Sequence, residues 1–380
     1  MIIKKKEIFV VILQTFFLVS VVMFSVVPFS CKVTEEGIEI IGGDYENPCL
    51  QNVSVVDGKT VELQFSDSIV LRDLVVSKFI EGVSDSDEHS ESICLSPSLA
   101  AACGEYGKIN VSTSSSDDGK TITFIFDKET EIGSKYEVFG TVEDAVGNSL
   151  TFCVPFTGFN SFIPRMIITE AQIKYGKGSS SGETIYRAEF VELMALEDGN
   201  LSGLELLSAS DGEEKKFVFP AIDVKKGEII LVHPRTKEGG CINEDGDDLN
   251  LATAPHSKDG VRDLWSENLD SRYNDSTDVI YLRNSVDNSV MDVLLYAAEG
   301  SEEWKSNVQE IVNLVCGAGL CNSSEISAAV VSKGVSPLKS LTRLNAPEIF
   351  EKVMNGEEID FPLVFEASDW AVCGVTSGGM

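Results

Sequence analysis

Polar and apolar residues alternate along two segments of the chain, and this alternation constrains the fold more than any other feature. Residues 52–65, NVSVVDGKTVELQF, and residues 109–126, INVSTSSSDDGKTITFIF, each carry it on both sides of an Asp-Gly dipeptide. In the first segment, Asp57-Gly58 readily takes the positive φ angles of a two-residue type I′ turn. Each segment therefore predicts a β-hairpin, and together they predict an antiparallel sheet with one buried face.

Another pair of strands is predicted over residues 136–159, YEVFGTVEDAVGNSLTFCVPFTGF. The Val-x-Asp-x-x-Gly-Asn pattern between these strands resembles the final hairpin of bacterial immunoglobulin-like domains of the surface-layer type. Asp144, Gly147 and Asn148 match the turn of that family. The resemblance covers residues 47–158 and implies an immunoglobulin-like β-sandwich.

The chain from Pro164 onward resembles the lamin-tail domain, a compact immunoglobulin-like sandwich that also occurs in exported bacterial proteins. The resemblance spans residues 164–380 and rests on short segments that match strands and turns of that family. These segments are IITE at 167–170, EFVEL at 189–193, LSGL at 201–204, DVIYLRN at 278–284, SLTRL at 340–344 and SDWAVCGVTSGG at 368–379. The resemblance implies a second β-sandwich.

Two insertions interrupt the lamin-tail pattern. Residues 239–278 form an oversized acidic loop, and residues 301–334 form a helical insertion. Within the second insertion, apolar residues recur at helical spacing from Trp304 to Val315, and residues 324–332 predict another short helix. We therefore expect an all-β protein with two immunoglobulin-like β-sandwich domains in tandem, the second carrying a small helical insertion. Inserted loops on such a scaffold are where recognition is usually found.

Residues 1–30 are predicted to be a signal peptide, because three lysines precede an apolar run over residues 8–27 that has no ionisable side chain. Cys31 follows this run where the sequence turns polar, and its position resembles the relaxed lipobox of spirochaete-type bacterial lipoproteins. In that family the thiol is acylated with fatty acids such as palmitate, which would make residues 31–46 a lipidated tether. An uncleaved membrane anchor is the alternative, because about 20 apolar residues also span a bilayer.

Both alternatives predict a location in the cell envelope, on the periplasmic face or the surface of a bacterial membrane. For a lipoprotein, the bilayer itself is a partner through the acylated Cys31, since two or three acyl chains anchor a protein durably. The formal net charge of the chain is −31. Such a charge repels phosphate backbones, so we expect no nucleic-acid partner.

The chain has nine cysteines, and those besides Cys31 divide evenly between the two predicted domains. An oxidising location outside the cytoplasm predicts disulfides within each domain. Short separations favour the pairs Cys94–Cys103 and Cys316–Cys321, which leaves Cys49–Cys153 and Cys241–Cys373. Zinc is not expected, because no CxxC motif occurs and the three histidines do not have ligand spacing.

Four acids in the acidic loop are candidate calcium ligands: Glu244, Asp245, Asp247 and Asp248. Calcium takes several carboxylate oxygens, and a glycine among these acids permits a sharp turn. Their spacing does not match an EF-hand, so a plain solvated loop is the alternative.

Three aromatic residues in or beside the insertions, Trp265, Tyr273 and Trp304, are candidate partner-binding residues. An exposed aromatic ring there would stack on a glycan or anchor a protein partner. Packing against the sandwich core is the alternative.

No catalytic motif is recognisable. His256, Ser257 and Asp259 supply the residue types of a hydrolytic triad, but triad members must meet in space and no nucleophile elbow accompanies them. The sequence predicts a non-enzymatic envelope interaction or structural module that binds a protein or glycan partner through its inserted loops. It predicts no cofactor apart from the candidate calcium. The alternatives are an exported hydrolase or an accessory subunit of one, and a calcium-stiffened spacer.

Overall fold

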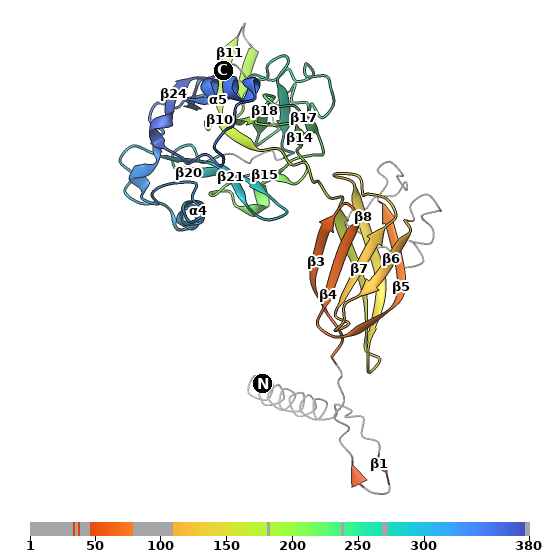
Figure 1. Ribbon diagram of the computed structural model, residues 1–380. Helices are drawn as coiled ribbons and strands as arrows, with labels where there is room; N and C mark the ends of the chain where they lie inside the picture. The colour runs from red at the N-terminus through yellow and green to blue at the C-terminus, as the bar shows by residue number, and fades with distance from the viewer. Residues whose placement is uncertain are drawn as a thin grey trace, which may run out of the picture.

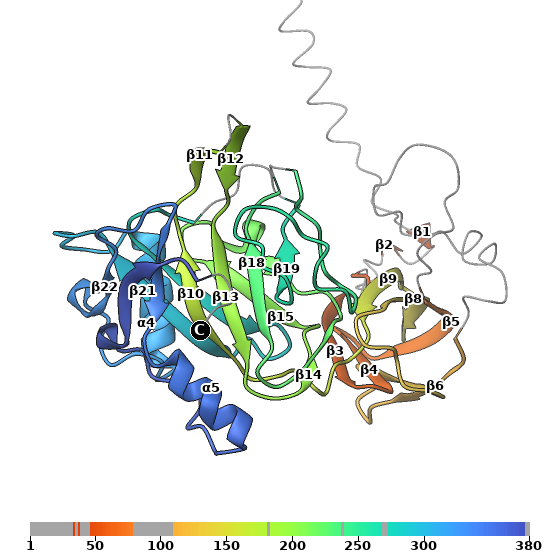
Figure 2. The ribbon, with the colours of Figure 1, turned by 90° about the horizontal axis from the view of Figure 1, so that it is seen from above.

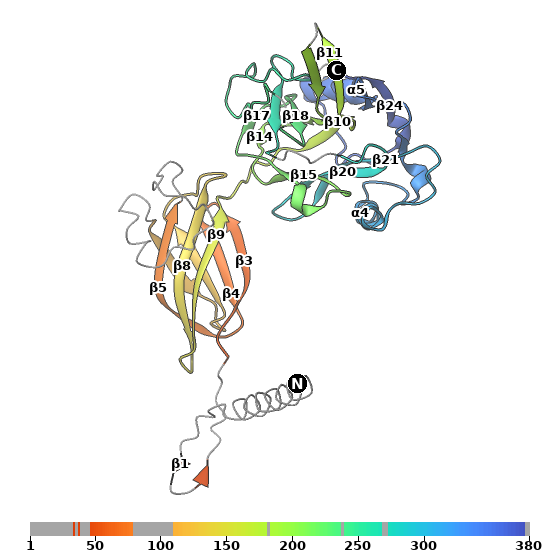
Figure 3. The same ribbon diagram turned by 180° about the vertical axis from the view of Figure 1, so that it is seen from behind.

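The computed structural model describes residues 46–78, 109–180, 183–236, 239–267 and 273–376, together with the two-residue strands β1 (Val33–Thr34) and β2 (Gly37–Ile38). Two bodies built of strands follow one another along the chain (Figures 1 and 3). The predicted signal peptide, Cys31 and the Cys94–Cys103 pair lie outside the described residues. Among the helices that the structure describes, none is both long and apolar enough to cross a membrane.

The first body is a β-sandwich of two antiparallel sheets. Its four-stranded sheet runs in the order β3 (Leu50–Asp57), β4 (Thr60–Phe65), β7 (Thr121–Phe126) and β6 (Val111–Ser115), and its three-stranded sheet in the order β5 (Ile69–Lys78), β8 (Lys135–Asp144) and β9 (Ser149–Thr157). Alternate residues of β4 and β7 are buried, as the sequence period of two predicts. The core between the sheets includes Leu63, Phe65, Phe124 and Val138.

The two predicted hairpins form, but the first turn differs from the prediction. Asp57 pairs with Thr60 after a register shift that begins at Val55, so Gly58 and Lys59 make the loop. Gly58 does not have a φ in the left-handed region, and the type I′ assignment is therefore wrong. The bulge advances the loop by one residue, and the Asp57 carboxylate accepts a hydrogen bond from the Lys59 amide at 2.7 Å instead.

The turn between β8 and β9 has the geometry that its sequence predicts. Gly147 has a φ of 95°, a conformation that suits glycine because it has no Cβ. One oxygen of Asp144 accepts hydrogen bonds from the amides of Val146 and Asn148, both at 2.9 Å. The Asn148 side chain donates to the other oxygen at 2.8 Å, so the aspartate fixes the whole turn.

The second body is a larger sandwich with a mixed six-stranded sheet facing a mixed five-stranded sheet. The six-stranded sheet runs β19 (Arg262–Trp265), β18 (Ile229–His233), β13 (Phe190–Ala195), β10 (Met166–Gln172), β23 (Lys339–Arg343) and β24 (Trp370–Gly374). The five-stranded sheet runs β16 (Phe217–Val218), β15 (Leu204–Ser208), β20 (Asp278–Asn284), β21 (Val290–Ala297) and β22 (Val330–Val331). Both bodies thus have the sandwich-like, all-β architecture that the sequence predicts.

Two smaller strand pairs complete this body: β14 (Gly199–Asn200) with β17 (Asp223–Val224), and the hairpin of β11 (Gly176–Ser180) and β12 (Glu183–Arg187). Figure 2 shows β10, β13 and β18 side by side, with the β11–β12 hairpin projecting beyond them. The hairpin matters for function because its last residue, Arg187, lies beside the candidate site described below.

The insertion after residue 301 contains one α-helix, not two. Helix α4 (Ser306–Gly317) buries Val308, Val312 and Val315 against the core, as their spacing predicts. Residues 324–332 were predicted to be helical, but they form only the 3₁₀ turn η2 (Ile326–Ala328) and the strand β22. The helix prediction is wrong because Val330 and Val331 pair with β21 at the edge of the five-stranded sheet.

Helix α5 (Ala346–Asn355) was not predicted, although the sequence carries its signals. Pro347 stands in the first turn, and the helix is capped after its last residue by Gly356, which has a φ of 74°. Ile349 and Val353, one turn apart, are buried against Ile167 and Met194 on the outer face of the six-stranded sheet. This face of the sheet is therefore covered by helix α5. The body also contains two short 3₁₀ turns, η1 (Glu213–Lys215) and η3 (Ala367–Asp369), which have no buried residues.

One of the predicted disulfides is present: Cys316 and Cys321 are bonded, with their Cα atoms 4.6 Å apart. Cys49 and Cys153 are not bonded to each other: Cys49 lies just before β3 of the four-stranded sheet, and Cys153 lies on β9 of the three-stranded sheet. Cys153 stands between the buried Phe152 and Val154, so its side chain points outward from its sheet.

The predicted bond between Cys241 and Cys373 is also absent. Cys373 lies on β24, at one edge of the six-stranded sheet, whereas Cys241 packs beside Trp265 of β19 at the other edge. Five strand spacings separate these edges, or about 24 Å at roughly 4.8 Å each. A disulfide needs Cα atoms within about 7 Å, so the sheet itself prevents this pairing.

Candidate binding pocket

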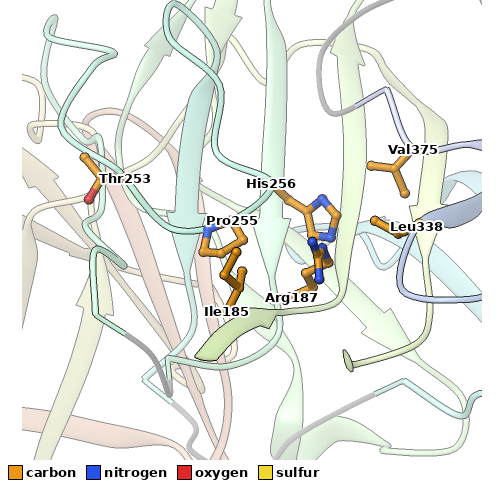
Figure 4. Close-up of a pocket in the computed structure, with 7 residues that line it drawn as sticks. All are labelled: Ile185, Arg187, Thr253, Pro255, His256, Leu338 and Val375. Carbon is orange, nitrogen blue, oxygen red and sulfur yellow. The ribbon is translucent and has the colours of Figure 1, made fainter. Parts of the chain in front are cut away.

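A cavity of ≈ 570 Å³ lies in the second sandwich, beside the β11–β12 hairpin. Four segments that are far apart in the sequence line it. They contribute Ile185 and Arg187 from β12, Thr253, Pro255 and His256 from the acidic loop, Leu338 from just before β23, and Val375 from just after β24. Figure 4 shows Arg187 and His256 together in the middle, between Ile185 and Pro255 on one side and Leu338 and Val375 on the other.

His256 occupies an unusual turn. The amide of Ser257 donates a hydrogen bond to the carbonyl of Ala254 at 2.9 Å, and this closes a four-residue turn with Pro255 in second place. His256, in third place, has a φ of 82°. A turn with proline second and a positive φ third is type II, and it normally has glycine there. A side chain is therefore held in a backbone conformation that disfavours it, which is typical of functional sites.

The His256 ring is neutral at physiological pH. Burial is the main cause that lowers its pKa, with the nearby His233 and Arg187 adding to the effect, and the pKa falls to about 4. The ring makes a hydrogen bond with the backbone of Pro337, which has only a carbonyl to offer. Nε2 of the ring is buried and has no hydrogen-bond partner.

Arg187 supplies a positive charge to the same cavity. Each of the other arginines in the described part of the chain pairs with a carboxylate, whereas Arg187 takes part in no ion pair there. The guanidinium lies over Gly178, where a Cβ would stand only 2.4 Å from Nη1. An unpaired arginine is unexpected in a chain with 61 acidic residues. We take it as the strongest mark of a binding site for an anion.

Buried polar groups support the cavity from beneath. His233 is fully buried at the end of β18, and its ring stacks on Trp265 with the centroids 3.7 Å apart. Its Nε2 lies 2.8 Å from the Asp263 carboxylate and its Nδ1 lies 3.1 Å from the Glu189 carbonyl. Both partners are hydrogen-bond acceptors and hold the ring in place. Phe190 lies between this ring and His256, at centroid distances of 5.9 and 5.6 Å.

The pair formed by His233 and Asp263 has a structural role, because both side chains are buried. The His233 and Asp263 side chains are 0% and 1% exposed, so no substrate reaches them. The cavity above has no carboxylate among its lining residues. Three residues supply the residue types of a hydrolytic triad: His256 lines the cavity, Ser257 has a buried hydroxyl, and Asp259 is exposed. The arrangement does not place an acid where it would orient His256 as a base.

The three aromatic candidates are buried, and this corrects the prediction that they contact a partner. Trp265, Tyr273 and Trp304 are 3%, 5% and 6% exposed. Trp265 stacks on His233, and the Trp304 indole donates to the carbonyl of Ser324 at 3.1 Å. They pack in the core of the second body, as the alternative interpretation expected.

The four calcium candidates do not gather into a site. No group of three or more potential ligands occurs among the described residues. Glu244 is 1% exposed, and its carboxylate accepts backbone hydrogen bonds from Leu251, Ala252 and Asp263 at 2.8 to 3.0 Å. Its oxygens are thus committed to the loop itself. Asp245, Asp247 and Asp248 are exposed.

None of the pocket residues other than His256 was predicted, because a cavity built from four distant segments leaves no local pattern. One local signal was available. The stretch Ala-Pro-His-Ser at 254–257 has the proline of a type II turn without the usual glycine after it.

The low pKa of His256 predicts a loss of stability in acid. The folded pKa of about 4 is below the unfolded value of 6.5, so the unfolded chain binds more protons between these values. This contribution is fully present above pH 6.5 and is lost as the pH falls towards 4. We expect about 2 kcal/mol less stability at pH 5 than at pH 8 from this group. Urea unfolding should show a flatter pH profile for His256→Asn, which tolerates the positive φ, than for wild type; equal slopes would contradict the assignment.

Comparisons with known proteins place the second body. Residues 164–372 match the family TP_1001_2nd, described as a protein second domain. An uncharacterized protein of Treponema pallidum (strain Nichols) is 26% identical over 175 residues, which are 45% of this chain and 41% of that protein. The chain thus matches less than half of the length of that relative.

Solved structures resemble the chain only distantly. A DUF4876 family protein from Bacteroides thetaiotaomicron is 13% identical, with 73% of this chain and 83% of that chain covered and a TM-score of 0.27. The N-terminal part of the bacterial S-layer protein SbsC is 12% identical, with 40% and 41% covered and a TM-score of 0.22. Likeness at this level carries no functional argument. The family match covers more than half of the chain, and the chain therefore belongs to the TP_1001_2nd family.

Proposed function

We propose that this chain is an exported, lipid-anchored bacterial envelope protein whose second domain binds a partner without catalysing a reaction. The observation that carries the binding role is the cavity between the β11–β12 hairpin and the acidic loop. Arg187 lines this cavity and takes part in no ion pair within the described part of the chain. Its guanidinium remains available to a ligand, while the cavity offers no carboxylate for acid–base chemistry.

The acidic loop supports the notion that inserted segments recognise the partner. It supplies Thr253, Pro255 and His256 to the cavity, so it contributes more lining residues than any other segment. This loop is an insertion relative to the lamin-tail pattern that the second domain resembles. A rigid sandwich that presents an inserted loop is a common scaffold for binding a protein or glycan.

The envelope location rests on the sequence at Cys31. The apolar run ends there, and residues 46–376 would then lie outside the cytoplasm, held by acyl chains on the thiol and the new amino terminus. The bond between Cys316 and Cys321 agrees with an oxidising compartment.

Metabolic labelling tests the anchor. Cells that express the wild-type chain and are fed alkyne-palmitate should yield a labelled protein of the mature size, whereas Cys31→Ala should lose the label and keep the signal peptide. Protease added to intact cells then reports which side of the membrane the domains face. Labelling that persists in Cys31→Ala would contradict the lipoprotein assignment.

A further inference from the structure

The pocket around Arg187 and His256 has the chemistry to recognise one particular group. Arg187 presents a planar fork of N–H donors, which matches the two oxygens of a carboxylate. His256 lies beside Arg187 (Figure 4), and its ring is neutral because burial lowers its pKa to about 4. A ligand that suits these two residues needs a single carboxylate.

Apolar side chains line the remainder of the pocket. Ile185 and Pro255 stand on one side, and Leu338 and Val375 stand on the other (Figure 4). Leu338 is 60% exposed, so a large apolar surface at the rim has no cover within the described part of the chain. An apolar group on the ligand would remove that surface from water, at about 25 cal/mol per Å².

We propose that this pocket binds the carboxylate end of an acylated amino acid with an apolar side chain. In such a group the carboxylate and the side chain are attached to the same carbon. The carboxylate pairs with Arg187, and the side chain lies on Leu338 and Val375. This inference rests on the binding role proposed above and specifies its ligand.

The geometry of the site favours this ligand over a larger anion. A cavity of ≈ 570 Å³ is in the range of small-molecule sites and has room for one terminal residue. It offers one guanidinium, whereas phosphate groups are usually held by several cations or backbone amides. The acidic surface of the chain also opposes highly charged anions.

Two sources supply the same chemistry: the free carboxyl terminus of a peptide, and a small N-acylamino acid. A peptide would continue out of the open side of the pocket, whereas a small acid would end inside it. The two are distinguished by comparing a hexapeptide that ends in leucine with N-acetyl-leucine.

Fluorescence anisotropy on the full chain in detergent tests the proposal. The probe is a fluorescein-labelled hexapeptide that ends in leucine with a free carboxylate; the same peptide with a terminal amide is the control ligand. We expect the free acid to bind at least tenfold more tightly than the amide. Competition by unlabelled N-acetyl-leucine as strong as by the unlabelled peptide assigns the small acid, and weaker competition assigns the peptide. Equal binding of acid and amide, or no binding of either, would overturn the proposal.

Variants locate the binding in this pocket. Arg187→Gln should weaken binding of the free acid about tenfold or more, since it removes a charge-assisted pair. Arg187→Lys should restore part of the affinity, because it keeps the charge but not the planar fork. Arg72→Gln, which makes the same charge change on the first sandwich, should leave the affinity unchanged. If Arg72→Gln weakened binding as much as Arg187→Gln, the effect would be one of net charge and the pocket would be excluded.

Loss of this binding and loss of the envelope role have different signatures. A chain that takes up palmitate at Cys31 but does not bind the peptide overturns the ligand assignment alone. A chain that binds the peptide but is never acylated leaves the pocket assignment in place and removes the anchor.

Discussion

Asp292→Asn should lower the free energy of unfolding of the second body by about 3 to 5 kcal/mol, because it leaves an arginine buried without its counter-charge. Asp292 on β21 is 0% exposed, and Arg343 on β23 is 2% exposed. One oxygen of Asp292 accepts hydrogen bonds from Arg343 and, at 2.7 Å, from the amide of Ile168. Arg343 also donates to the carbonyl of Ile168 at 2.7 Å. The urea midpoint of unfolding measures the loss.

This ion pair joins the two sheets of the second sandwich across the core. β21 belongs to the five-stranded sheet, whereas β10 and β23 belong to the six-stranded sheet. The guanidinium also lies over the Trp370 ring, 4.8 Å from its centroid. Burial raises the pKa of Asp292 above its ordinary value, although Arg343 opposes this shift. The pair is thus costly to bury, and its disruption is expected to cost more than its replacement.

Two further variants separate these effects. The double variant Asp292→Leu with Arg343→Met removes both charges together, so it should recover most of the stability that Asp292→Asn loses. Glu299→Ala removes one partner of the Lys333–Glu299 pair, whose side chains are 67% and 62% exposed. This control should change stability by less than about 1 kcal/mol. A loss from Asp292→Asn no larger than that of the control would contradict the role of the buried pair.

The sequence predicts those parts of the fold that depend on neighbouring residues. The hairpins and the Asp144 turn follow from alternation and from turn residues within a few positions of one another. Helix α4 follows in the same way from the spacing of its buried valines. Such features need no knowledge of the rest of the chain.

The predictions that were wrong depended on distant residues. Pairing Cys241 with Cys373 required knowing that a six-stranded sheet separates them. The helix expected at 324–332 is mostly absent because residues 330–331 pair with β21, which lies more than 30 residues earlier. In each case tertiary contacts decided between structures that the local sequence allowed.

The candidate site was the least predictable part for the same reason. Local sequence identified the acidic loop as an insertion that would carry recognition, yet the aromatic residues and acids singled out in it do not line the pocket. Arg187 becomes notable only when the structure shows that no carboxylate pairs with it. His256 becomes notable only through its positive φ and its unpartnered nitrogen.

Glu244→Gln should destabilise the second body by about 3 kcal/mol and also abolish binding at the pocket. The carboxylate accepts hydrogen bonds from the amides of Leu251 and Ala252 through one oxygen and from the amide of Asp263 through the other. Glutamine would place an N–H₂ group against one of these donors and remove the charge, and charge-assisted bonds contribute about 1.5 to 3 kcal/mol each. Thermal unfolding and the anisotropy titration measure the two effects.

The link between stability and binding runs through the acidic loop. Glu244 ties residues 251 and 252 to β19, and the pocket residues Thr253, Pro255 and His256 follow directly along the chain. Asp247→Asn, at an exposed position in the same loop, makes the same charge change and should alter stability by less than about 0.5 kcal/mol.

Adding calcium tests whether Glu244 acts instead as a metal ligand. Because both oxygens already accept backbone hydrogen bonds, we expect the melting temperature of the wild-type chain to be the same in calcium and in chelator. A rise in melting temperature with calcium that disappears in Glu244→Gln would instead show that the loop exchanges these bonds for a metal ion. The carboxylate would then stiffen the domain as a ligand, and the pocket wall would depend on calcium.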